Sequence, residues 1–117
     1  MGNFTYQIVT GTGEAVDATP DVTIIAAQGT SKTLRIQKII ISVTVAAVGG
    51  GGEVALEDGV GGTRFIEADA DAVRSFMVDF GEEGYPLTSN TLLNLTVDNA
   101  VTTQATARAT VVAKVVG

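Results

Sequence analysis

Acidic side chains are the groups in this sequence best suited to chemistry, because hard cations bind carboxylate oxygens. Between positions 53 and 83, only Arg64 and Arg74 oppose the acids Glu53, Glu57, Asp58, Glu67, Asp69, Asp71, Asp79, Glu82 and Glu83. Asp69 and Asp71 alternate as they do in calcium-binding loops, but the glycine and the later glutamate of an EF-hand are missing. We therefore interpret the acids as a solvated surface, and Asp69 and Asp71 are the candidates for a divalent ion.

The sequence lacks most of the residues that common catalytic sites require. The chain has no His and no Cys, which excludes a Ser-His triad, a thiol nucleophile and the usual zinc ligands. The glycine-rich stretches 11–13 and 49–52 lack the Lys-Ser or Lys-Thr of a phosphate-binding loop, so both are predicted to be flexible turns. Paired carboxylates could serve a glycosidase, but the chain has no Trp to stack on sugars. We predict no enzymatic activity, no catalytic residue and no cofactor.

Composition limits the class of partner. Seven basic residues against 13 acidic ones give a formal net charge of −6, which disfavours binding to nucleic acid or to an anionic membrane surface. With 45% hydrophobic residues, the chain is apolar enough to fold, and 117 residues correspond to a single domain. No nucleic-acid or membrane partner is expected.

Apolar and polar residues alternate at every second position through most of the chain, which is the period of a half-buried strand. The alternation is longest near the C-terminus, where one face carries Ala105, Ala107, Ala109, Val111, Ala113 and Val115. Its parity changes across Gln37 and Lys38, which predicts a β-bulge. Further along, Asn94 and Thr96 alternate with leucines and are predicted to lie on a solvated face. Phe76 and Phe80 are expected in the core.

These segments amount to about eight strands, with turn signals at intervals of roughly ten residues. The predicted fold is an all-β antiparallel β-sandwich, and a jelly roll is preferred over an immunoglobulin-like sandwich or a closed barrel. Residues 69–74 could form a single helical turn. We expect residues 1–20 to form an extended N-terminal arm with a first strand near positions 4–8 and an irregular connection after it. Residues 21–117 would form the β-sandwich domain.

The order of the segments resembles the β-sandwich head decoration, or cement, proteins of tailed bacteriophages. The resemblance covers about residues 33–97 and depends on the segments Thr33–Ser42, Val54–Gly59, Phe76–Phe80, Tyr85–Leu87 and Asn90–Val97. It implies a non-enzymatic virion structural protein that binds the outer surface of an assembled capsid and stabilises it. The implied partner is the major capsid protein, the implied assembly a homotrimer, and the implied location the capsid exterior. The alternatives are a tail-fibre or other virion β-sandwich subunit, and a carbohydrate-binding lectin-like module.

Six residues are candidates for the oligomer or capsid interface. The alternating Phe4, Tyr6 and Ile8 lie in the expected arm, which could add a strand to a neighbouring subunit. Arg35 and Lys38 lie on either side of the predicted bulge and could pair with acidic groups of a partner. Ile40 lies in a run of three isoleucines, so either the bulge turns it inward, which we favour, or it faces a partner subunit.

Overall fold

The computed structural model describes residues 7–16, 20–46, 52–99 and 105–117. These residues form nine β-strands and no helix, which confirms the predicted all-β class, with one strand more than expected. The strands are β1 (Gln7–Ala15), β2 (Asp21–Ile25), β3 (Thr33–Val45), β4 (Gly52–Asp58), β5 (Thr63–Asp69), β6 (Arg74–Asp79), β7 (Tyr85–Pro86), β8 (Leu93–Asn99) and β9 (Thr106–Val116). No helix that could span a membrane occurs within these ranges.

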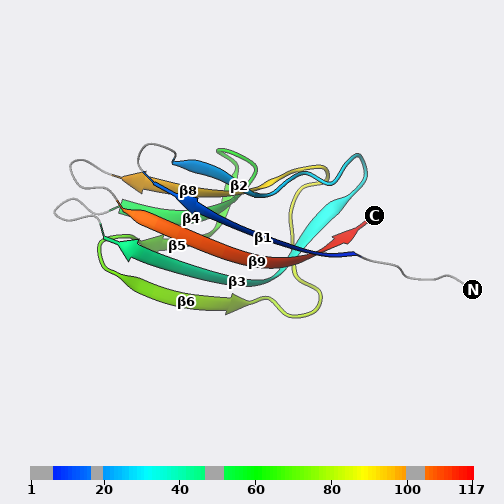
Figure 1. The fold of residues 1–117 in the computed structure, drawn as a ribbon. Helices are drawn as coiled ribbons and strands as arrows, with labels where there is room; N and C mark the ends of the chain where they lie inside the picture. The colour runs from blue at the N-terminus through cyan, green and yellow to red at the C-terminus, as the bar shows by residue number, and fades with distance from the viewer. Residues whose placement is uncertain (1–6, 17–19, 47–51, 100–104) are drawn as a thin grey trace, which may run out of the picture.

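The strands form two antiparallel sheets that pack face to face (Figure 1). The first sheet has the order β1-β9-β3-β6, with the short β7 also paired to β3, and the second has the order β2-β8-β4-β5. Consecutive strands cross from one sheet to the other except at the β4–β5 hairpin and between β6 and β7. Without β7, this connectivity is that of a jelly roll, as predicted.

The core lies between the sheets and is made largely of aliphatic side chains from β3, β4, β8 and β9. All six apolar positions predicted for the C-terminal strand are buried. The predicted bulge is also present, because the pairing of β3 with β9 shifts between Ile36 and Lys38. Phe76 and Phe80 are half-buried and pack against the core, and the Phe80 ring centroid lies 6.2 Å from that of Phe65 on β5.

The glycines at positions 11 and 13 do not form the predicted flexible turn. Both lie inside β1, which pairs with β9 from Gln7 to Ala15. A Cβ atom on Gly11 would lie 2.1 Å from the Ile24 carbonyl oxygen, so a side chain there would clash with β2. Glycine is therefore needed where the edges of the two sheets approach each other closely.

Other local predictions also need correction or cannot be compared. Residues 70–73 connect β5 to β6 without a helical turn, because Asp69 still belongs to β5 and Arg74 already begins β6. Asn94 and Thr96 are buried instead of solvated. Residues 1–6 of the expected arm and residues 47–51 of the glycine run lie outside the described residues, and Gly52 begins β4.

Candidate assembly surface

The first sheet presents one continuous outer face to the outside of the molecule. Side chains alternate along each strand, so the residues between the buried core positions of β1, β9, β3 and β6 share this face. We call it the first-sheet face. Its members are Ile8, Thr10, Thr12, Glu14, Arg108, Thr110, Val112, Lys114, Arg35, Lys38, Ile40, Ser42, Ser75, Met77 and Asp79.

The middle of the first-sheet face carries no charge and holds two exposed apolar side chains. Ile40 is 44% exposed and Met77 60% exposed, and they lie opposite each other on β3 and β6. Ile40 also lies opposite Thr110 of β9, whose hydroxyl oxygen is 3.4 Å from that of Thr12 on β1. The expectation that the bulge turns Ile40 inward is therefore wrong, because its neighbours Ile39 and Ile41 occupy the core positions.

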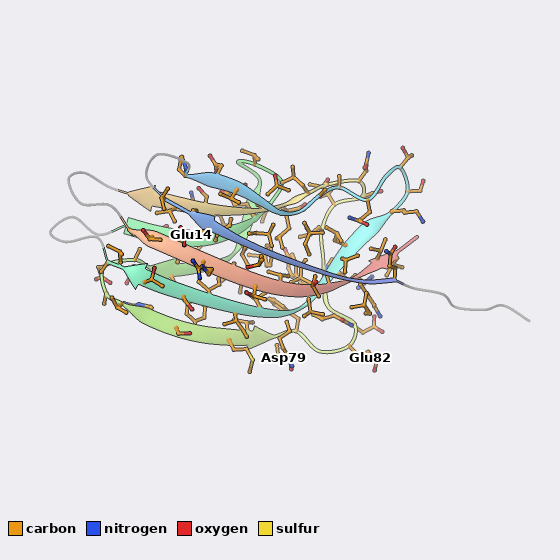
Figure 2. All side chains as sticks on the ribbon, in the orientation of Figure 1. Glu14, Asp79 and Glu82 are labelled. Atoms are coloured by element: carbon orange, nitrogen blue, oxygen red, sulfur yellow. The ribbon has the colours of Figure 1, made fainter. Side chains whose placement is uncertain are left out.

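Charged side chains lie at both ends of this uncharged middle. At one end Arg108 donates a hydrogen bond to the Glu14 carboxylate across β9 and β1. At the other end Lys38 lies opposite Asp79, and both line an open depression of about 350 Å³ with Glu82. Figure 2 labels Glu14 at the first end and Asp79 and Glu82 near the second. A centre without charge, surrounded by a polar rim, is typical of protein contact surfaces.

The structure brings four of the six predicted interface residues to this one face. Arg35 and Lys38 lie on the same outer side as Ile40, and the Arg35 guanidinium donates to the Glu83 carbonyl over 3.4 Å. Ile8 on β1 joins them through Lys114, which lies opposite both Ile8 and Arg35. Phe4 and Tyr6 lie outside the described residues. Sequence reasoning missed Met77, although its position between Phe76 and Val78 placed it opposite the core.

The outer face of the second sheet is organised differently, around a buried polar network. Glu57 on β4 is only 4% exposed and accepts hydrogen bonds from the Asn94 amide at 2.9 Å, the Gly61 backbone N–H at 3.1 Å and the Arg64 Nε at 3.1 Å. Asn94 also donates to Asp21 at 3.0 Å, and Arg64 donates to Glu53 at 3.2 Å. The network joins β2, β8, β4 and β5.

The candidate ion ligands Asp69 and Asp71 are not assembled into an ion site. Asp69 lines an open depression of about 360 Å³ with Glu53 and Glu67. Asp71 instead pairs with Arg74, whose guanidinium lies 3.0 Å from its carboxylate. Within the described part of the chain, no group of three or more acidic side chains could hold a metal ion.

Comparison with known proteins shows that chains of phage capsid structures have a similar fold. No family model and no curated protein sequence match this chain. A chain of the cyanophage Pam1 capsid asymmetric unit superposes with a TM-score of 0.59 at 14% sequence identity, covering 97% of this chain and 89% of that one. A chain from the acidic stable capsid structure of Helicobacter pylori bacteriophage KHP30 gives a TM-score of 0.55 at 16% identity, covering 97% and 99%. This jelly roll therefore shares its fold, over nearly its whole length, with chains of two phage capsid structures.

Proposed function

We propose that this protein is a non-enzymatic structural subunit of a bacteriophage virion, which binds the outer surface of the assembled capsid and stabilises it. The observation that supports this most strongly is the match of the entire jelly roll to single chains in two phage capsid structures. Coverage of both chains is nearly complete, so the similarity extends beyond a shared motif. Because fold alone does not determine function, the surface chemistry has to support the proposal as well.

The surface chemistry favours contact with protein. An exposed apolar pair, Ile40 and Met77, lies between charged groups on the first-sheet face, and burying it would be favourable by the hydrophobic effect. The formal net charge of −6 disfavours contact with packaged nucleic acid, which supports the exterior of the shell. The partner would be the major capsid protein.

The proposed assembly is a homotrimer in which the first-sheet face, which includes Arg35, Lys38 and Ile40, contacts neighbouring subunits or the shell. The N-terminal residues Phe4 and Tyr6 would extend this contact. Deletion of residues 2–6 leaves the whole of β1 in place, so the variant should fold and lose shell binding. If that variant binds as tightly as the full chain, the N-terminal contact is refuted.

The number of copies in purified virions tests the function directly. Mass spectrometry against the major capsid protein should give a near-stoichiometric ratio, and added protein should raise the temperature at which particles release their genome. A handful of copies per particle would instead indicate a tail or fibre subunit. Absence from virions would overturn the virion function, and a glycan array would then test the lectin alternative.

A further inference from the structure

We propose that β6 is a self-association edge: it pairs with β6 of a second copy, antiparallel and across a two-fold axis, and joins two first sheets into one continuous sheet. The proposal goes beyond the virion function and does not depend on it. It rests on how this edge differs from the other three, on the direction of its backbone groups and on its side-chain pattern.

Three of the four sheet edges carry features that discourage pairing with another chain. The edge strand β1 lies against β2, where the Gly11 backbone approaches Ile24 closely. The pairing of β2 with β8 is irregular between Thr23 and Ile25, and an irregular strand is a poor template. The edge strand β5 carries charged side chains along its length, at Arg64, Glu67 and Asp69.

The edge at β6 has none of these features. Among the described strands, β6 pairs with β3 alone, and it lies at the lower margin of the sheet in Figure 1. Its four middle residues, from Ser75 to Val78, carry no charge, and its two charged residues, Arg74 and Asp79, lie at its ends. Phe76 and Val78 are half-buried, and Met77 is exposed. An uncharged open edge of this kind is a template for another strand.

The backbone groups of β6 determine how a second strand could pair. The Phe80 N–H donates to the Gln37 carbonyl over 2.7 Å, so the backbone groups of Phe80 point towards β3. Backbone groups alternate in direction along a strand, so Phe76 and Val78 also point to β3. The N–H and C=O groups of Ser75, Met77 and Asp79 therefore point to the open edge.

One antiparallel register uses all of these groups. It places Met77 opposite Met77 of the second copy, and Ser75 opposite Asp79 of the second copy, as hydrogen-bonded pairs. On the inner side, Phe76 then lies opposite Val78 of the second copy, which would cover two half-buried apolar side chains. On the outer side, the Asp79 carboxylate then lies opposite the uncharged Ser75 of the second copy, so this register places no like charges directly opposite each other.

A single introduced cysteine tests this register, since the chain has no cysteine of its own. In a hydrogen-bonded antiparallel pair the Cα atoms are about 5.5 Å apart, which a disulfide can span. Met77→Cys should therefore give a covalent dimer on a non-reducing denaturing gel after mild oxidation. Val60→Cys is the matched control, because Val60 is 62% exposed in the turn between β4 and β5, away from β6.

A second variant tests the backbone contact without adding a thiol. Met77→Pro removes an N–H that points to the open edge and leaves the hydrogen bonds of β6 with β3 in place. Sedimentation equilibrium should show loss of the two-fold contact, with an unchanged circular dichroism spectrum. The proposal is overturned if Met77→Cys forms no more covalent dimer than Val60→Cys, or if Met77→Pro associates as the unmodified protein does. These readouts concern only the β6 contact, so they can fail while the virion function holds.

Discussion

The outer faces of the two sheets differ in how completely this single chain uses their side chains. On the second sheet, Glu57 is almost fully buried, and its two carboxylate oxygens together accept three hydrogen bonds. On the first sheet, Ile40 and Met77 lie in the middle of the face with about half of their surface exposed. The comparison indicates that the second face satisfies most of its buried polar groups within the molecule, with the Asn94 side-chain oxygen as the exception, whereas the first is available for a partner.

The largest expected difference in stability is between substitutions on the core side of β3 and substitutions on its exposed side. Ile39→Ala removes a fully buried side chain and should lower the free energy of unfolding by about 3 kcal/mol. Ile40→Ala, at the next position, should cost less than about 1 kcal/mol, because Ile40 is half exposed. Urea unfolding of the two variants measures both values. Equal losses would mean that Ile40 is a core residue.

A smaller effect should appear in the polar network of the second sheet, where two acids bind the same arginine. Glu57→Ala removes a buried acceptor of the Arg64 Nε and of the Asn94 amide, and it should cost about 2 kcal/mol. Glu53→Ala removes the half-exposed partner of Arg64 and should cost about 0.5 kcal/mol. If thermal and urea unfolding rank the two variants in the reverse order, the second face is not held by a buried network.

The smallest effect concerns the charged end of the first-sheet face. The side chains of Glu14 and Arg108 are both exposed to solvent. A double-mutant cycle with alanine at each position should therefore give a coupling free energy of about 0.5 kcal/mol at low salt. At about 1 M NaCl, screening should remove most of that coupling. A coupling that persists in high salt would show that this end is less solvated than the face as a whole.

The strand pattern was predictable because alternation is a local signal. The bulge at Gln37 and Lys38 and the buried face of β9 followed directly from the parity of the apolar residues. The assignment of strands to sheets was not predictable, because in a jelly roll most neighbours in a sheet are distant in sequence. For the same reason, the sequence predicts a turn at Gly11, whereas in the structure this glycine lets β2 approach closely.

The polar residues were harder to assign than the apolar ones. Asn94 was correctly placed on the outer side of its strand, but its burial depends on Glu57 and Asp21, which lie far away in the chain. Three of the predicted interface residues lie on β3 itself, and Ile8 joins them on the first-sheet face through the pairing of β1 with β9. Nothing local in the sequence indicates that pairing.

The mass of the protein in solution tests most directly whether the first-sheet face is an assembly surface. We would compare the unmodified chain with Ile40→Asp and Val60→Asp by sedimentation equilibrium, since both substitutions place a carboxylate at an exposed aliphatic position. Ile40→Asp should lower the average mass while its circular dichroism spectrum stays that of the folded chain, and Val60→Asp should leave the mass unchanged. If folded Ile40→Asp retains the full mass of the assembly, the first-sheet face is not the surface through which the subunits associate.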